Sequence, residues 1–435
     1  MLKCFWRKNL LIYGLLQFVG VVYYVVCLMR QGFLPAPFIA DKYDTFMDFF
    51  HAMYWAIHEG RYDVWQSVYP PINFIFLSIV NYISIPVGNY PSGFSLRENG
   101  LWSIVLFFVI SIVLSFCVIK FRSWKSVSPR ERLLILAAYF MGTPFLFAIE
   151  RGNLIVYSVI FISMAMSGVP ILRILAVAFL VNLKPYFAVI YFLYIAKRKM
   201  GELLISLFAA GALYVFSGVM LGSDPLAIPR NLLVFSNVMP FSPGAVMTGM
   251  LSSVSAYSFV SDFVVEHSIG ILSGKFVLLC ADAAKYANMV IILSAFATMF
   301  LRGDSLKSSF VLLIIFCIIT NMSITVGAYT LVFYFPLIPV ILERRYAKVL
   351  LIMVAIIFLP LDIVKYTSSS TVEQISYLSG SSVQVPAEVG LGALLRPVLN
   401  LAILALLTFE AATTARPAPG TAGEEGSDFR AVEQV

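Results

Sequence analysis

The sequence predicts an all-α polytopic membrane protein, and three observations carry this prediction. Hydrophobic residues make up 60% of the 435 residues, charged residues only 12%, and the mean hydropathy is +0.90. Soluble domains carry roughly 25% charged residues. Apolar runs recur along the chain, many of them near the ~20 residues that a membrane-crossing helix needs. Lysine and arginine gather in short clusters between these runs, which is typical of inner loops and excludes a nucleic-acid-binding stripe.

The first predicted element is a retained membrane span over residues 9–29. It follows a basic start with Lys3, Arg7 and Lys8 and has no small-residue cleavage site, so we expect a cytoplasmic N-terminus. Residues 30–100 then form a first extracytoplasmic loop. Its apolar run at 71–86 is interrupted by Asn81 and is too short to cross. We expect this run to form a juxtamembrane or re-entrant helix.

Eleven further spans are expected, alternating in direction so that the basic clusters fall inside. They cover residues 101–120, 132–149, 154–170, 171–183, 185–196, 203–221, 276–301, 308–326, 328–342, 347–363 and 391–409. This gives about twelve spans in one domain of residues 1–409, with both termini cytoplasmic. Residues 222–275 form a second long outer segment, and the Ser-rich stretch 366–390 forms a third outer loop. Residues 410–435 read as a disordered cytoplasmic tail.

The acidic stretch of residues 40–71 is the first candidate site. Ionisable groups are costly in an apolar chain, so a cluster of them indicates function. Asp44, Asp48 and His51 are spaced by four and three residues, with His58 one heptad beyond, so on a helix they would share one face. A carboxylate beside an imidazole suits a general base. Asp48 is favoured because its neighbours are apolar, and a solvated helix face is the alternative for the other acids.

Two cations form the second candidate site. Arg151 in ERGN and Lys184 in NLKP follow apolar runs and precede an immediate return into the membrane. A fixed cation at the mouth of a membrane cavity would suit a lipid-linked phosphate, which Arg can hold bidentately and Lys as a point charge. The alternatives for Arg151 are a salt bridge with Glu150 or contact with lipid headgroups.

Several kinds of chemistry lack their motifs. The five cysteines are scattered, without metal-ligand or CxxC spacing, and are expected to be small buried hydrophobes. No HExxH, GxSxG or P-loop motif occurs, and no inner loop is long enough for a nucleotide-binding domain. We expect no cofactor. A divalent metal held by Asp44 and Asp48 is possible but has no further support.

The motifs in their order resemble glycosyltransferase family 87. They are Asp48-Phe49-Phe50, Gly60-x-Tyr62, Tyr69-Pro70-Pro71, Arg151-Gly152-Asn153 and Lys184-Pro185. The resemblance covers roughly residues 40–200. It implies the C-type membrane glycosyltransferase fold and a polyprenyl-phosphate sugar donor. It also implies that the aspartate of the first outer loop is the catalytic base, which is Asp48 or, as the rival, Asp44.

The expected function is therefore inverting transfer of a hexose, with mannose favoured, at the extracytoplasmic face of a bacterial plasma membrane. The acceptor would be a hydroxyl of a lipid-linked or cell-envelope glycan. Arg151 and Lys184 would hold the donor phosphate, and the expected substrate-binding residues are His51, His58, Tyr62, Tyr69 and Asn153. A lipid-linked oligosaccharide polymerase and a flippase or transporter of lipid-linked glycans remain alternatives. The expected partners are the donor, the glycan acceptor and membrane lipids, with no nucleic acid.

Overall fold

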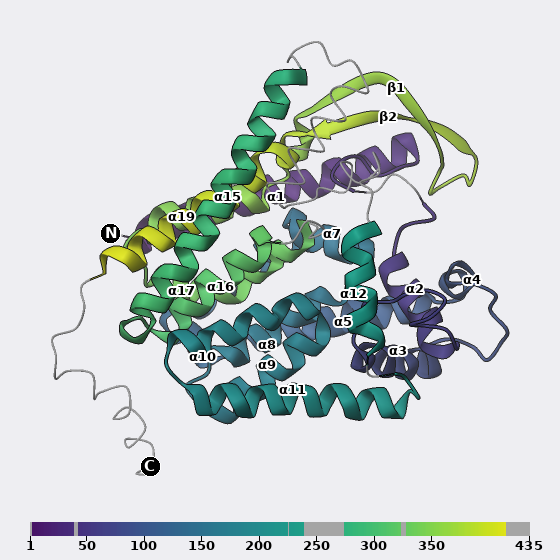
Figure 1. Cartoon of the computed structure of the whole chain (residues 1–435). Helices are drawn as coiled ribbons and strands as arrows, with labels where there is room; N and C mark the ends of the chain where they lie inside the picture. The colour runs from purple at the N-terminus through teal and green to yellow at the C-terminus, as the bar shows by residue number, and fades with distance from the viewer. Residues whose placement is uncertain (1, 39–41, 225, 239–273, 323–327, 415–435) are drawn as a thin grey trace.

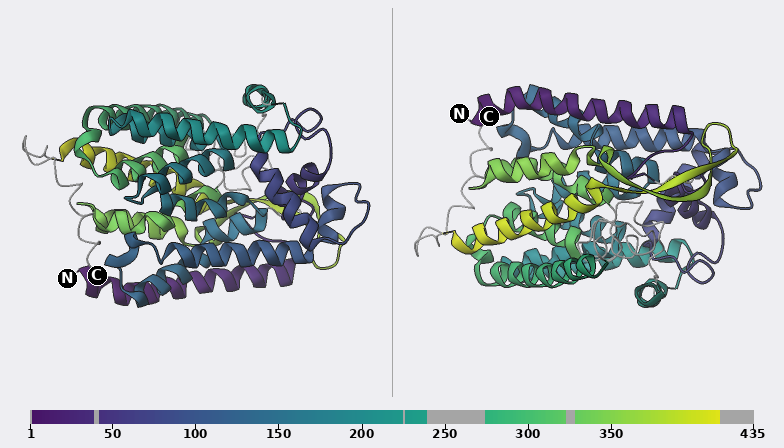
Figure 2. Two further views of the ribbon diagram at one scale, coloured as in Figure 1. Left: turned by 90° about the horizontal axis from the view of Figure 1, so that it is seen from below. Right: turned by 90° about the horizontal axis from the view of Figure 1, so that it is seen from above.

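The computed structural model describes residues 2–38, 42–224, 226–238, 274–322 and 328–414, and the chain is mostly helical. The long helices lie side by side as an elongated bundle (Figure 1). The start of α1 (Leu2–Gln31) and the end of α19 (Leu391–Thr413) lie at one end, which we call the terminal end (Figures 1 and 2). The short helices α2 (Met47–Ile57), α3 (Pro71–Ser84) and α4 (Gly93–Glu98) lie at the opposite end, which we call the loop end.

Most of the remaining helices run back and forth between these two ends, whereas α12 (Ala227–Val238) lies crosswise at the loop end (Figures 1 and 2). The α-helices are α5 (Leu101–Val118), α6 (Pro129–Phe140), α7 (Thr143–Arg151), α8 (Ser158–Ala165), α9 (Pro170–Leu183), α10 (Phe192–Ala196), α11 (Met200–Met220), α12 (Ala227–Val238), α15 (Gly274–Arg302), α16 (Ser308–Met322), α17 (Tyr334–Leu342) and α18 (Ala347–Phe358). Short 3-10 helices join several of them: η1 (Arg122–Ser126), η2 (Leu154–Tyr157), η3 (Pro185–Tyr191), η4 (Gly303–Ser305), η5 (Ala328–Phe333) and η6 (Leu361–Ile363).

Five helices in the described part of the chain are long and apolar enough to cross a membrane. They cover Asn9–Gln31, Leu101–Val118, Met200–Met220, Tyr286–Ser305 and Leu391–Thr413. The pair α6 and α7, bent by 51°, would make a sixth. The other predicted spans are occupied by shorter apolar helices, so the chain has the helices of a membrane protein while the count of twelve stays a prediction. Helix α3, with 14 residues, measures about 21 Å at ~1.5 Å per residue, too short to cross a core of about 30 Å.

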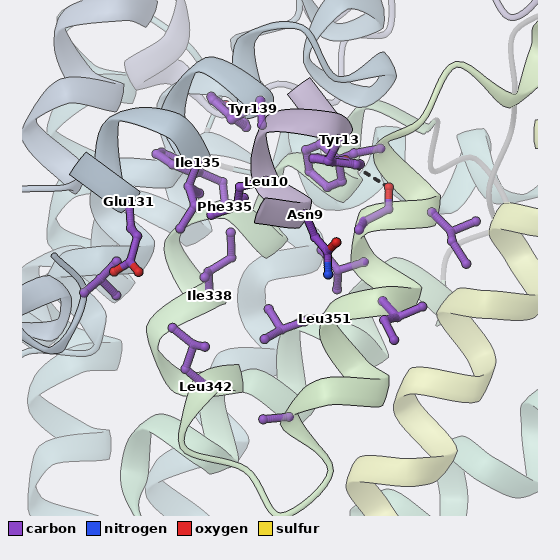
Figure 3. A pocket seen from close by; sticks show the side chains of 18 of the residues that line it. Asn9, Leu10, Tyr13, Glu131, Ile135, Tyr139, Phe335, Ile338, Leu342 and Leu351 are labelled. Atoms are coloured by element: carbon purple, nitrogen blue, oxygen red, sulfur yellow. Dashed lines mark hydrogen bonds between the residues drawn. The ribbon is translucent and has the colours of Figure 1, made fainter. Parts of the chain in front are cut away.

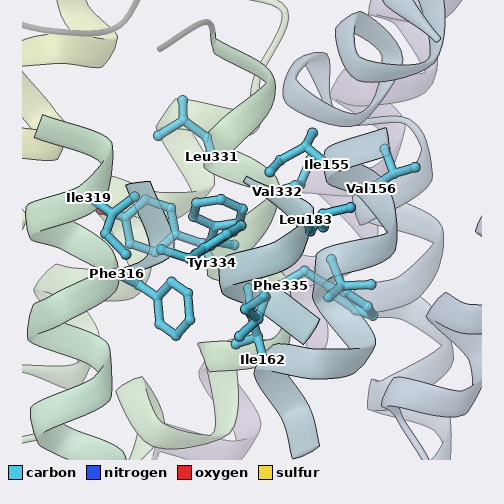
Figure 4. Packing of buried hydrophobic residues seen from close by; sticks show 14 of the residues in the cluster. Ile155, Val156, Ile162, Leu183, Phe316, Ile319, Leu331, Val332, Tyr334 and Phe335 are labelled. Atoms are coloured by element: carbon cyan, nitrogen blue, oxygen red, sulfur yellow. The ribbon is translucent and has the colours of Figure 1, made fainter. Parts of the chain in front are cut away.

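The core of the bundle lies around α16, η5 and α17. Helix α16 is buried from Phe310 to Asn321. Figure 4 shows side chains of α16 and α17, such as Phe316 and Phe335, packed with Ile155 and Ile162 from the other side. Helix α16 meets protein on all sides, which agrees with its being apolar all round and not along one stripe.

The prediction of an all-α fold is wrong at the third outer loop. This loop is a β-hairpin, in which β1 (Lys365–Ile375) pairs antiparallel with β2 (Ser382–Gly390). Val372 faces Val385 across the ladder. Threonine and valine favour extended backbone because their branched Cβ fits a pleated surface, and the serine content masked this signal. In Figure 1 the hairpin lies beside α1 and extends toward the loop end.

Several predicted segments lie partly outside the described residues, among them the start of the acidic stretch at residues 40–41 and the end of the predicted span 308–326 at residues 323–326. In the second long outer segment, the described part forms α12, and residues 239–273 lie outside the description. Helix α19 continues to Thr413, four residues into the predicted disordered tail, because the sequence EAAT extends its run of helix-forming residues. Residues 415–435 lie outside the described residues.

Candidate functional site

Residues 42–46, which precede α2 and which we call the acidic loop, are hydrogen-bonded to the end of α7. Phe46 caps α2 with a left-handed backbone (φ 62°), and its N–H donates to the carbonyl oxygen of Glu150 at 2.8 Å. The helix begins at Met47, so Asp48 lies in its first turn, where a carboxylate interacts favourably with the helix dipole. Asp44 precedes the helix. The expectation that Asp44 and His58 share a helix face with Asp48 and His51 is therefore wrong, because α2 spans only residues 47–57.

Gly152 allows the ERGN turn to pack directly on this loop. Its backbone is left-handed (φ 63°), which ends α7, and a Cβ built there would lie 2.8 Å from Phe46 Cδ1 and 2.8 Å from Phe49 Cβ. Asn153 then caps η2, accepting from the N–H of Ile155 at 3.1 Å. The turn therefore needs a glycine between Arg151 and Asn153 for both conformational and steric reasons.

Arg151 joins the two candidate aspartates. Its Nη1 donates to Asp44 Oδ2 at 2.5 Å, and its Nη2 donates to Asp48 Oδ1 at 2.6 Å. Asn153 Nδ2 donates to the second oxygen, Asp48 Oδ2, at 2.7 Å. The side chains of Arg151, Asp48 and Asp44 are 13%, 22% and 41% exposed. The structure thus brings four of the predicted site residues together, and Arg151 contacts aspartates rather than the adjacent Glu150.

Lys184 lies at the junction of α9 and η3. Its Nζ lies 3.9 Å from the centroid of the Tyr69 ring, a cation–π contact. Burial lowers the pKa of Lys184, and the nearby hydroxyl of Tyr329 and carboxylate of Asp48 oppose this shift. Within the described residues, no carboxylate forms an ion pair with Lys184. The junction therefore holds a half-buried cation whose charge no carboxylate of the described residues neutralises directly.

Tyrosines connect Lys184 to the aspartates. Burial raises the pKa of Tyr69, the negative charge of Asp48 raises it further, and Arg151 opposes the shift, so Tyr69 lies within electrostatic range of both. Tyr329 likewise lies within electrostatic range of Lys184, Asp48 and Arg151. The hydroxyl of Tyr186 is buried and has no hydrogen-bond partner among the described residues, and it interacts electrostatically with Tyr69 and Tyr329. Lys184 and Tyr186 therefore share Tyr69 and Tyr329 as neighbours, and a cation near an orphaned hydroxyl is suited to binding an anion.

The two histidines of the acidic stretch lie apart. His51, on α2, is stacked with Trp55 at a ring-centroid distance of 6.1 Å. Burial lowers the pKa of His51, although Asp44 and Asp48 oppose the shift. His58 follows the end of α2, where its Nδ1 lies 2.8 Å from the carbonyl oxygen of Tyr54 and its ring stacks on Tyr54. His51 thus lies near the aspartates, whereas His58 contacts the end of its own helix.

Tyr62 is hydrogen-bonded to the backbone of Tyr69. Its buried ring packs edge-on against Phe74, and its hydroxyl donates to the carbonyl oxygen of Tyr69 at 3.0 Å. The predicted substrate-binding residue Tyr62 therefore holds the backbone of the predicted substrate-binding residue Tyr69.

Sequence reasoning missed residues that position the site. Arg97 of α4 donates from Nη1 to three carbonyl oxygens of the acidic loop, those of Lys42, Tyr43 and Thr45, at 2.8, 3.1 and 2.9 Å. Asn73 of α3 donates to the carbonyl oxygen of Asn182 at 2.9 Å, beside the Lys184 junction. Asn73, a polar residue in an apolar run, was an available signal, whereas Arg97 lies among polar residues, and the partners of both are distant in sequence.

Glu150 adds a third carboxyl group near Arg151, besides those of Asp44 and Asp48. Glu150 is 7% exposed, its Oε1 accepts from the hydroxyl of Thr45 at 3.2 Å, and its Oε2 has no hydrogen-bond partner. The hydroxyl of Thr45 also bonds to that of Tyr377, in the turn of the hairpin. This chain of contacts joins the loop carrying Asp44 to both α7 and the hairpin.

Arg151 occupies the position between Asp44 and Asp48 where a divalent cation would otherwise bridge them. Among the described residues, no group of three or more His, Cys, Asp or Glu side chains is arranged to hold a metal ion.

Comparison with protein-family models, with curated proteins and with solved structures found no match.

Proposed function

We propose that this protein is a membrane glycosyltransferase that moves a hexose, mannose being favoured, from a polyprenyl-phosphate donor to a hydroxyl of a lipid-linked or cell-envelope glycan. The observation that carries the proposal is the half-buried Lys184 cation, which has no ion-pair partner among the described residues and lies within electrostatic range of the Asp48 carboxylate. A phosphate-binding cation beside a carboxylate is the pair of groups that transfer from a glycosyl phosphate requires. Its placement between membrane helices suits a lipid-linked donor.

In this proposal Lys184 binds the donor phosphate. The phosphate leaves carrying negative charge, and a fixed cation in a site of low dielectric stabilises that charge as it develops. The hydroxyl of Tyr186, buried without a partner among the described residues, would supply a further hydrogen-bond donor. Lys184 needs no rearrangement to act, because no carboxylate within the described residues competes for its ammonium group.

Asp48 acts as the general base. The acceptor oxygen forms a bond to the anomeric carbon, the bond from that carbon to the phosphate oxygen breaks, and the acceptor proton passes to Asp48. Asp48 is favoured over Asp44 because Lys184, Tyr69 and Tyr329 each interact electrostatically with Asp48. Arg151 and Asn153 hold one carboxylate oxygen each, which leaves a further lone pair on each oxygen to accept a proton.

This assignment changes the expected role of Arg151. Both of its terminal nitrogens already donate to aspartates, so we propose that it positions Asp48 and that Lys184 alone carries the phosphate-binding charge. The guanidinium is rigid and donates from one nitrogen to each aspartate, so it fixes the two carboxylates relative to each other better than an ammonium group could.

The test uses purified protein in liposomes with radiolabelled polyprenyl-phosphate mannose or glucose and a glycan acceptor. We expect Asp48→Asn to reduce transfer by ~10² to 10⁴, the usual contribution of a general base. Lys184→Met should weaken donor binding as well as transfer. Asp63→Asn is the matched control, because Asp63 is an exposed acid of the same loop. Full transfer by Asp48→Asn would refute its role, and movement of intact donor across the bilayer without sugar transfer would indicate a flippase.

A further inference from the structure

An apolar cavity of about 560 Å³ lies between α1, α6, α17 and α18, away from the candidate site. Figure 3 shows side chains of all four helices converging on it, among them Leu10, Ile135, Ile338 and Leu351. The cavity is partly open to its surroundings. Two of its lining residues are charged. Glu131 lies in the first turn of α6, and Glu343 directly follows α17, so both lie toward the terminal end.

The cavity lies directly behind a membrane-facing helix. Residues 9, 10 and 13 of α1 line it, whereas Leu11 and Leu15 on the other face of α1 are 54% and 62% exposed. Helix α1 is one of the five candidate membrane spans. The apolar lining is therefore continuous, around the edge of α1, with a surface that faces lipid.

Neither water nor this chain's own tail suits the cavity. A water molecule held in a cavity needs about two to four polar partners, and this lining is mostly apolar. An empty space of this size is costly because its lining loses packing contacts. Residues 415–435 are rich in Gly, Pro, Ala and Glu, with only one aromatic residue, so they offer no apolar segment to fill it.

We propose that the cavity binds one hydrocarbon chain of a bilayer phospholipid, with the headgroup at the terminal end beside Glu131 and Glu343. A phospholipid has the required shape, because it is apolar along its chain and polar at one end, as the cavity is. The bilayer supplies it at high local concentration. Its headgroup would lie in the leaflet opposite the candidate site, since α6 and α7 run from Glu131 at the terminal end to Arg151 at the site.

The donor's own polyprenyl chain does not fit this location. Lys184 follows α9, which packs against α11, and α11 lies across the bundle from α1 (Figure 2). A donor held by its phosphate at Lys184 would thus leave its chain on the other side of the core. The inference does not depend on the proposed function, because it concerns a lipid that takes no part in the chemistry.

The test is photo-crosslinking of the full chain in lipid nanodiscs. The probe is phosphatidylethanolamine with a diazirine near the end of one acyl chain, and labelled peptides are mapped by mass spectrometry. We expect labelling within residues 126–139 and 335–359. Leu351→Trp should reduce it about tenfold, because an indole ring would occupy the cavity. Leu15→Trp is the control, because it adds the same ring on the lipid-facing side of α1.

The outcomes separate the alternatives. Thermal unfolding of both variants checks folding, and Ile338→Phe narrows the same cavity from another helix if Leu351→Trp does not fold. Equal labelling of folded Leu351→Trp and Leu15→Trp would overturn the proposal. The proposal would also be overturned if a polyprenyl-phosphate probe labelled these peptides and the phosphatidylethanolamine probe did not. Finding no label on these peptides in the wild-type protein would overturn it as well. None of these readouts uses transferase activity.

Discussion

At the residue scale, Gly152 determines how closely the arginine turn approaches the acidic loop. We expect Gly152→Ala to destabilise the protein by about 1 to 3 kcal/mol, because alanine is strained at φ 63° and its Cβ would lie 2.8 Å from Phe46 and Phe49. Thermal unfolding in detergent measures the effect. Gly201→Ala is the control, since a Cβ there meets nothing within 4 Å. Equal unfolding temperatures for the two variants would show that the turn can relax.

The lowered pKa of Lys184 predicts a pH dependence of donor binding. Burial holds this pKa below the ordinary value of 10.5, so the ammonium group loses its proton, and donor binding weakens, as the pH rises through the lowered value. Between that value and 10.5 the unfolded chain binds one more proton than the folded chain. The free energy of unfolding should therefore rise with pH in this window, and below it Lys184 should contribute no pH dependence.

Lys184→Arg provides the check on this prediction. A guanidinium stays charged throughout the accessible pH range, so the alkaline decrease of donor affinity should disappear in this variant. Equilibrium binding of polyprenyl-phosphate sugar between neutral and alkaline pH measures it. An unchanged alkaline decrease in Lys184→Arg would assign the titration to another group.

At the element scale, the hairpin is fixed at its base and at its turn. At the base, Arg396 Nη2 donates to Asp362 Oδ2 at 2.6 Å, and the two side chains are 2% and 1% exposed. At the turn, the N–H of Tyr377 donates to the carbonyl oxygen of Gly32 at 2.6 Å, while its hydroxyl contacts Thr45. The hairpin therefore links α19 to the loop that carries Asp44.

Asp362→Asn tests the base of the hairpin. We expect it to lower the free energy of unfolding by about 3 to 5 kcal/mol, because Arg396 would remain charged and buried without a carboxylate. The ion pair between Arg198 and Asp304 is exposed, and Asp304→Asn should cost at most about 1 kcal/mol. Thermal unfolding of both variants in the same detergent makes the comparison. A similar small loss for both would mean that water or another hydrogen-bond acceptor reaches Arg396.

At the scale of the whole molecule, the start of α1 and the end of α19 share one end of the bundle (Figure 2). The proposed topology places this end in the cytoplasm and the loop end outside. In a cysteine-free background, Asp63→Cys should react with a membrane-impermeant maleimide in intact cells, and Lys125→Cys should react only after permeabilisation. Reaction of Lys125→Cys from outside would reverse the topology and remove the donor site from the extracytoplasmic face.

The sequence predicts much of this site because its signals are local. Charges in an apolar chain are costly wherever they lie, so Asp44, Asp48, Arg151 and Lys184 could be selected without knowing their contacts. Their partners could not be predicted. Arg151 meets Asp48 across 103 residues, and Arg97 reaches the acidic loop across more than fifty. Such pairings depend on how helices pack, which a single sequence does not record.

The amino-acid sequence by itself determined that this chain is an apolar helical protein and which of its polar groups require an explanation, because hydropathy and charge act residue by residue. Only the tertiary structure decided that Arg151 holds two aspartates, that Lys184 has an aromatic partner instead of a carboxylate, and that the Ser-rich loop is a hairpin. These features follow from long-range packing and strand pairing, whose free energies depend on residues that are neighbours only after folding.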